Sequence, residues 1–247
     1  MNWSTIRKSL PRYVLCCFPS IVLTTNQAIE HAGLDPEWKV DVISMSFGFP
    51  DKPGKTYTAI SEAIEKVRKG RDGSVLFLAS AGNSWQRRQD FPACHEDVIP
   101  IYAADSNGGF LHSNPAHTGK EREKLGTYGT DIPPAIIKEI QDNFTEVNLG
   151  AGTSIATAIA TGIVAMTLSY VAALPSLLDF KASEEVYAKL YTPKGMRQML
   201  LAMSINMGYR QHFICPESFW GERPKHLDVH TSICCAVEKM NEEESRK

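Results

Sequence analysis

Apolar residues along the chain form short continuous runs and longer segments with helical spacing. Three runs of mainly apolar residues, rich in β-branched side chains, are typical of buried strands. They lie at 40–46, 75–80 and 98–103. Between the first two, the apolar positions from Ile60 to Val67 share one helical face, which predicts a helix over 56–69 that ends at Gly70. Strands alternating with a helix predict right-handed crossovers and a parallel sheet, and therefore an α/β fold.

A longer apolar segment contains no charged residue. Residues 155–174 lack Asp, Glu, Lys and Arg, and they predict a helix over 154–173 that is stopped by Pro175. A bilayer can be spanned by about 20 such residues, so a membrane anchor is one reading. The threonines and alanines of the segment, and the lack of a flanking positive cluster, favour a helix buried on nearly all sides inside a globular domain. We therefore expect no membrane partner.

The remaining pattern predicts loops and further helices. A short helix that starts at Thr24 or Thr25 is expected to end at Gly33. Clusters of Gly, Asn and Pro make 104–150 typical of loops, and from Leu174 onward the spacing is helical. An apolar stripe in this last part, typical of core packing, consists of Met196, Met199, Leu200 and Met203.

Composition and charge narrow the classes of function. The 247 residues suit one globular domain, and 43% hydrophobic with 22% charged residues is typical of a soluble protein with a sizeable core. The net charge of −2 provides no basic field for nucleic acid. The six cysteines form no C-x-x-C motif, which favours reduced thiols and a cytoplasmic location over a secreted one. Basic residues before the apolar run at 13–23 loosely imitate a secretory signal, but no clear cleavage site follows.

A serine lies in the first turn of the long uncharged helix. The segment 150–154 reads Gly-Ala-Gly-Thr-Ser. A hydroxyl at this position lies near unpaired backbone N–H groups and the positive end of the helix, and both favour a developing oxyanion. The same Gly-Thr-Ser opening is also an ordinary helix N-cap. By itself, Ser154 is therefore weak evidence for a nucleophile.

Polar residues also follow two of the predicted strands. The segment that comes directly after the second strand consists of Ser80, Ala81, Gly82 and Asn83. The first strand ends in Ser46, Phe47 and Gly48. Ligands of parallel α/β sheets meet polar groups at the carboxyl ends of the strands, where an asparagine can aim its amide N–H at a substrate carbonyl. Each segment also has an ordinary reading, as a turn or as a strand exit.

Together and in this order, the three segments resemble the subtilisin-like serine peptidases (subtilases, peptidase family S8). The resemblance covers about 24–170, and Phe91-Pro92-Ala93 and Gly126–Gly129 with Asp131 are similar to further stretches of the family. Residues 196–209 and 215–220 resemble the tail of a fungal branch. The resemblance implies a three-layer fold with a mainly parallel central sheet that lacks its N-terminal strands. It also implies a polypeptide substrate, no cofactor and no metal.

The resemblance assigns a role to each of the three segments. Ser154 matches the nucleophile that forms the acyl-enzyme, and Asn83 matches the side-chain donor of the oxyanion hole, paired with the backbone N–H of Ser154. The remaining residues match the two walls of the cleft that holds substrate side chains. One wall would be Ser46, Phe47 and Gly48, and the other Ser80, Ala81 and Gly82.

Two departures from the family pattern limit the expected activity. The Asp-x-Gly and His-Gly-Thr motifs that carry the other two triad residues occur nowhere in the 247 residues, and Ala158-Ile159 replaces the usual Pro-His after the serine. His31 lies in a helix that matches the segment after the catalytic histidine, so it is not expected to act as base. Because serine is a poor nucleophile without a base, we expect this chain alone to be nearly inert.

Two functions remain open at this stage. The chain is an N-terminally incomplete serine endopeptidase domain that is fused to, or associates with, the missing part, or it is an inactive remnant that binds peptides or proteins. The expected organisation is an unmatched segment over 1–23, the peptidase domain over 24–175, a helical extension over 176–240 and a disordered charged tail over 241–247.

Overall fold

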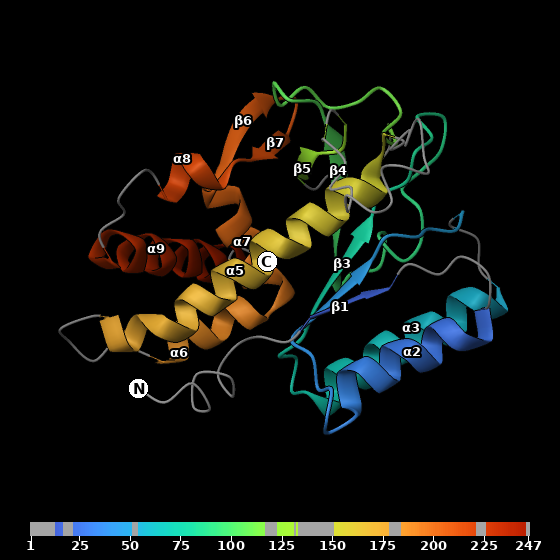
Figure 1. Cartoon of the computed structure of the whole chain (residues 1–247), viewed down its shortest axis with the longest axis horizontal. Helices are drawn as coiled ribbons and strands as arrows, with labels where there is room; N and C mark the ends of the chain where they lie inside the picture. The colour runs from blue at the N-terminus through green and yellow to red at the C-terminus, as the bar shows by residue number, and fades with distance from the viewer. Residues whose placement is uncertain are drawn as a thin grey trace, which may run out of the picture.

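Seven strands form one sheet in the computed structural model of the chain (Figure 1). The structure describes residues 13–16, 22–50, 54–116, 123–130, 132, 151–177, 184–220 and 226–245. The strands are β1 (Tyr13–Cys16), β2 (Val42–Met45), β3 (Leu76–Ser80), β4 (Val98–Ala104), β5 (Lys124–Tyr128), β6 (Ser204–Gly208) and β7 (Gln211–Ile214). Their order is β1-β2-β3-β4-β5-β7-β6, and only the pair β6 and β7 is antiparallel.

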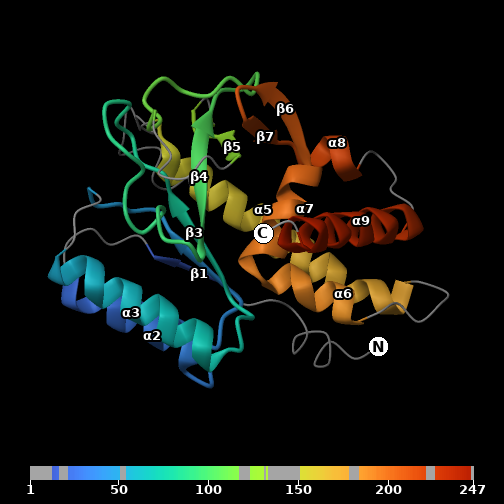
Figure 2. The ribbon, with the colours of Figure 1, turned by 180° about the vertical axis from the view of Figure 1, so that it is seen from behind.

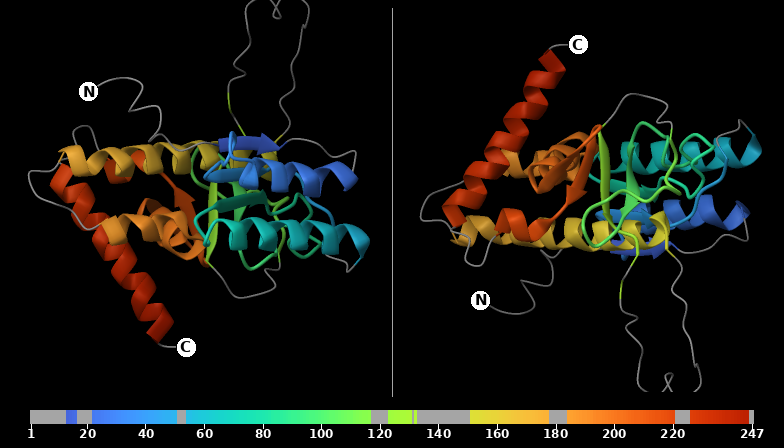
Figure 3. Two further views of the ribbon diagram at one scale, coloured as in Figure 1. Left: turned by 90° about the horizontal axis from the view of Figure 1, so that it is seen from below. Right: turned by 90° about the horizontal axis from the view of Figure 1, so that it is seen from above.

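Helices cover both faces of this sheet. They are α2 (Val22–Leu34), α3 (Lys55–Gly70), α5 (Thr153–Leu177), α6 (Glu184–Ala188), the 3-10 turn η1 (Lys189–Tyr191), α7 (Pro193–Ala202), α8 (Pro216–Trp220) and α9 (His226–Ser245). Figures 1 and 2 show α2 and α3 side by side. Figure 3 shows α5 as a long rod that reaches from the sheet to the C-terminal helices α6, α7 and α9. The result is the three-layer, mainly parallel α/β fold that the sequence predicted.

Strand β3 shows how one apolar run serves two cores. Leu76 and Leu78 pack in the cluster formed with α5 and the C-terminal helices, whereas Phe77 and Ala79 pack in the cluster formed with α2 and α3. Successive side chains of a strand point to opposite faces, so a strand covered on both sides needs apolar residues at every position. This requirement explains the continuous apolar runs of β2, β3 and β4, which lie where the sequence placed them.

Helix α2 starts earlier and ends later than predicted. It begins at Val22 and includes Gly33, the residue expected to end it. A Cβ built on Gly33 would lie 2.9 Å from Cγ2 of Val67 on α3. The glycine therefore permits close packing of two helices, which local stop signals do not reveal.

Helix α5 differs from the prediction at its end and on one face. It continues past Pro175 to Leu177, because a proline in the last turn removes few helical hydrogen bonds. It is long and apolar enough to cross a membrane by length and composition, but only 56% of its most apolar window is buried. Met166 is 65% exposed, and Ala158 and Gly162 are also exposed. The expectation of a helix buried on nearly all sides is therefore wrong for this face.

Four strands were not expected from the sequence. Strand β1 lies in the segment expected to be unmatched, and it pairs with β2 at the edge of the sheet. Strand β5 lies in the region expected to be loop, and β6 and β7 lie within the segment expected to be helical. These strands are short, and most residues of β6 are exposed at the sheet edge, so they show little apolar periodicity. Helix α9 continues to Ser245, inside the predicted disordered tail. The stripe from Met196 to Met203 is fully buried, as predicted.

Candidate functional site

The start of α5 lies against the residue that follows β2. The Oγ hydroxyl of Ser154 donates a hydrogen bond to the carbonyl oxygen of Ser46 at 3.0 Å. In return, the Oγ hydroxyl of Ser46 donates to the carbonyl oxygen of Ser154 at 2.9 Å. Both serines are half-buried. This reciprocal pair joins two segments that are 108 residues apart and places Ser154 at the carboxyl edge of the sheet.

Asn83 is held against the same helix start. Its Oδ1 accepts hydrogen bonds from the backbone N–H of Thr153 at 2.9 Å and from the hydroxyl of Thr153 at 3.1 Å. Thr153 Oγ1 also accepts from the backbone N–H of Gly82 at 3.3 Å. Because Oδ1 is used by Thr153, the Nδ2 group of Asn83 remains the donor of this exposed amide. Asn83 and Ser154 are thus brought together through one intervening residue.

Gly152 allows this close approach of Asn83 to the helix start. A Cβ on Gly152 would lie 2.8 Å from Nδ2 and 2.9 Å from Oδ1 of Asn83. The backbone N–H of Gly152 donates to the carbonyl oxygen of Gly129 at 2.8 Å, which ties the helix start to the end of β5. The absence of a side chain at 152 is therefore what lets the amide reach the helix. Gly150 and Asp131, which the sequence placed near this point, lie outside the described residues.

The two predicted walls face each other across Asp90. Phe49, next to the first wall, exchanges two backbone hydrogen bonds of 2.8 Å with Phe91. The backbone N–H of Asp90 donates to the carbonyl oxygen of Ala81 in the second wall at 2.9 Å. Burial raises the pKa of the Asp90 carboxyl, and the positive charge of Arg87 partly opposes this shift. Sequence reasoning did not single out Asp90, although it directly precedes the quoted Phe91-Pro92 pair.

No general base contacts the candidate nucleophile among the described residues. The Ser154 hydroxyl proton points to a backbone carbonyl, and no histidine or carboxylate of the described part hydrogen-bonds to it. His31 lies in α2, 3.5 Å from Asp35. His95 is buried beside Phe91, and this burial lowers the pKa of its imidazole. Neither histidine takes part in the contacts of the helix start.

The described residues contain no cluster of three or more His, Cys, Asp or Glu side chains that could hold a metal ion. Within the same part of the chain, no disulfide joins Cys94, Cys215, Cys234 and Cys235. The arrangement around Ser154 therefore consists of a hydroxyl, an amide and backbone groups, which suits acyl transfer by an oxygen nucleophile.

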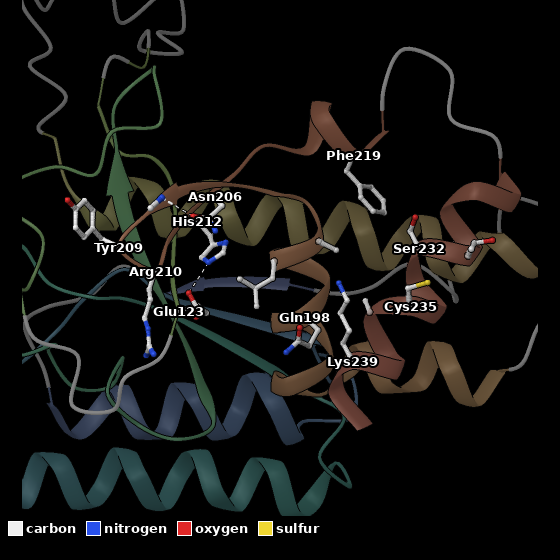
Figure 4. Close-up of a pocket in the computed structure, with 15 residues that line it drawn as sticks. Glu123, Gln198, Asn206, Tyr209, Arg210, His212, Phe219, Ser232, Cys235 and Lys239 are labelled. Carbon is white, nitrogen blue, oxygen red and sulfur yellow. Dashed lines mark hydrogen bonds and ion pairs between the residues drawn. The ribbon is translucent and has the colours of Figure 1, made fainter. Parts of the chain in front are cut away.

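A large pocket lies elsewhere, between the β6–β7 hairpin and the helices α7, α8 and α9 (Figure 4). Its volume is about 820 Å³. Among its lining residues, Glu123 and His212 are joined by a contact of 2.8 Å, and Lys239 also lines it. None of the site residues predicted from the sequence lines this pocket.

Solved protease structures share the fold of this chain. The "Prenylagaramide maturation protease PagA" matches 86% of this chain and 68% of its own length, with 21% identity and a TM-score of 0.56. The "Patellamide maturation protease PatA" matches 89% of this chain and 70% of its own length, with 19% identity and a TM-score of 0.55. The "PatG macrocyclase in complex with peptide" matches 88% of this chain and 57% of its own length, with 20% identity and a TM-score of 0.56.

The amino-acid sequence itself identifies the family. The sequence model of the Subtilase family (Peptidase_S8) matches residues 21–204. The matched range includes both walls, Asn83, the start of α5 and the chain as far as the first residue of β6. Since this range is well over half of the 247 residues, the chain belongs to the subtilase family of peptidases.

Proposed function

We propose that this chain is a serine endopeptidase domain that cleaves polypeptides through an acyl-enzyme on Ser154. Membership of a protease family implies peptide substrates, and the contact that joins Asn83 to the helix start supports the assignment of Ser154. An acyl-transfer site requires a nucleophilic hydroxyl with an amide donor close to it, and Asn83 contacts Thr153, the direct neighbour of Ser154.

In the proposed reaction, Ser154 Oγ attacks the carbonyl carbon of the scissile bond. The charge that develops on the carbonyl oxygen would be stabilised by the Nδ2 group of Asn83 and by the backbone N–H of Ser154. That N–H belongs to the first turn of α5, where backbone donors have no intrahelical partner and the helix dipole favours negative charge. In subtilisin, removal of the corresponding asparagine lowers turnover by about 10²–10³.

Proton transfer needs a group that the described residues do not provide at Ser154. In subtilisin, loss of the triad leaves only about 10³–10⁴ of the rate enhancement over water. We therefore propose that a histidine and an aspartate reach this site from a segment that is fused to, or associates with, this chain. The exposed residues Ala158, Gly162 and Met166 of α5 are one place where such a segment could dock.

Two observations favour a second function. The Ser154 hydroxyl donates to the Ser46 carbonyl, and Ala158-Ile159 follows where the family usually has Pro-His. Both features are compatible with an inactive subtilase that retains the cleft and binds extended peptides.

Reaction with a fluorophosphonate probe separates the two functions. In this reaction Ser154 Oγ forms a bond to phosphorus, fluoride leaves and the hydroxyl proton passes to solvent or to a base. We expect slow labelling of the 247-residue chain, at Ser154 only, by mass spectrometry of the digested protein. Peptide binding without any labelling, even when the segment that supplies the histidine and the aspartate is present, would support the inactive binder and contradict the peptidase.

A further inference from the structure

The carboxylate of Asp90 lies between the glycines of the two proposed walls. A Cβ built on Gly48 would lie 2.8 Å from Cβ of Asp90 and 3.2 Å from its Oδ2. A Cβ built on Gly82, in the opposite wall, would lie 2.6 Å from the same Oδ2. The side chain of Asp90 therefore touches the one glycine of each wall. Any other residue at 48 or 82 would displace it.

This carboxylate has no hydrogen-bond or ion-pair partner among the described residues, although it is partly removed from water. The contrast with other aspartates of the chain is clear. Oδ1 of Asp105 accepts from the backbone N–H groups of Asn107 and Gly109 at 2.9 and 2.8 Å. Oδ1 of Asp35 accepts from the backbone N–H of Glu37 at 2.9 Å. Those aspartates stabilise turns, whereas Asp90 has no such structural role.

A partly buried charge without a partner is unfavourable unless something pairs with it. Arg87 is near enough to influence the carboxyl, yet it forms no ion pair with Asp90 in the described structure. A positively charged side chain that enters between the walls would supply the partner that Asp90 lacks. A substrate side chain is the group that the proposed cleft would bring there.

We propose that Asp90 makes this site selective for a lysine or arginine side chain on the residue whose carbonyl Ser154 attacks. This inference rests on the proposed function, because it assumes that the substrate lies between the two walls. The carbonyl of that residue would face Asn83, so its side chain would extend from Ser154 along the first wall toward Gly48.

The length of the side chain fits this path. Ser46 is hydrogen-bonded to Ser154, and Gly48 lies two residues further, a span of at most about 7 Å of extended chain. Lysine and arginine carry their charge at the end of the longest side chains, and arginine can donate two parallel hydrogen bonds to a carboxylate. A neutral side chain would leave the carboxylate unpaired, and an acidic one would be repelled.

Binding of three matched peptides tests the proposal without requiring turnover. The fluorescent peptides are identical except at one central position, which carries arginine, its neutral isostere citrulline, or glutamate. We expect the 247-residue chain to bind the arginine peptide at least about tenfold more tightly than the citrulline peptide, and the glutamate peptide most weakly. Fluorescence anisotropy at neutral pH and moderate salt measures all three.

Two variants complete the design. Asp90→Asn, which keeps the size of the side chain, should remove the preference for arginine over citrulline. Asp35→Asn, a matched change at the aspartate that directly follows the end of α2, should preserve the wild-type order. Equal binding of all three peptides to the wild type, or a preference that survives Asp90→Asn, would overturn the selectivity and leave the cleft intact. Failure of every peptide to bind would overturn the cleft itself and this inference with it.

Discussion

The helix start at Ser154 and the pocket beside the β6–β7 hairpin are two very different candidate sites. The pocket has a volume of about 820 Å³ and is lined by residues of several chemical types, including a serine, a histidine and a cysteine. The helix start instead joins three distant segments through hydrogen bonds and glycine contacts.

This difference shows that size and chemical function need not coincide. In the pocket, Ser232 Oγ donates to the carbonyl of Asp228 within its own helix, and His212 pairs with Glu123. At the helix start, the hydroxyl of Ser154 donates to the carbonyl oxygen of Ser46, and the amide oxygen of Asn83 accepts from the backbone N–H of Thr153, the residue before Ser154. The second arrangement is the one that the proposed function requires, with a nucleophile beside donors for an oxyanion.

Replacement of each serine by alanine should produce the largest difference in labelling rate between the two regions. Ser154→Ala should abolish fluorophosphonate labelling, because it removes the attacking oxygen. Ser232→Ala, at a serine that is also half-buried and also lies in a helix, should leave the labelling rate unchanged. In-gel fluorescence over a time course measures both rates. Loss of labelling in Ser232→Ala would move the reactive site to the pocket.

Replacement of each of two asparagines by alanine should produce the next largest difference in labelling rate. Asn83→Ala should slow labelling of Ser154 by about 10²-fold, since one donor to the phosphonyl oxygen is lost. Asn206→Ala, which removes an acceptor for the backbone N–H of Gly208 beside the pocket, should have no effect on this rate. Equal rates for wild type and Asn83→Ala would show that the amide is only a structural contact to Thr153.

Alanine substitutions at two glycines with positive φ allow the packing of the two regions to be compared. Gly82 has φ +112 and a Cβ there would meet Asp90, whereas Gly208 has φ +85 and nothing within 4 Å of a Cβ. Gly208→Ala should lower the free energy of unfolding by about 1–2 kcal/mol through backbone strain alone. Gly82→Ala should lower it further, because the carboxylate must also move. Urea denaturation gives both values, and equal losses would contradict the close contact with Asp90.

The smallest expected effect is on the pH dependence of stability. Because burial raises the pKa of Asp90 in the folded state, the folded protein binds the proton more readily than the unfolded chain. Stability therefore falls as pH rises from the ordinary pKa of aspartate through the raised one, and it stays lower above that window. Asp90→Asn should slightly raise the melting temperature at neutral pH and should flatten this dependence. A lower melting temperature at neutral pH would indicate a structural role for the charge.

Much of the fold was predictable because its signals are local. The apolar runs of β2, β3 and β4 and the helical spacing of α3 reflect burial on both sheet faces, which any such strand or helix requires. Strands β6 and β7 were missed because their pairing, rather than an apolar pattern, defines them. The role of Gly33 was missed because it depends on Val67, a residue of another helix.

The candidate site divides in the same way. Ser154, Asn83 and the walls follow predicted elements and could be named from order and spacing, and their contacts with one another are now seen in space. Asp90 could not be named, because its place between Gly48 and Gly82 arises only from tertiary contacts. Their catalytic and binding roles remain predictions for the experiments above.

A crystal structure of the chain after fluorophosphonate treatment would test most directly whether Ser154 and Asn83 act together as an acyl-transfer site. The account predicts a phosphonyl group on Ser154 Oγ with its oxygen at hydrogen-bond distance, about 3 Å, from both Asn83 Nδ2 and the backbone N–H of Ser154. A phosphonyl oxygen that points to solvent, away from an Asn83 that binds only Thr153, would contradict it.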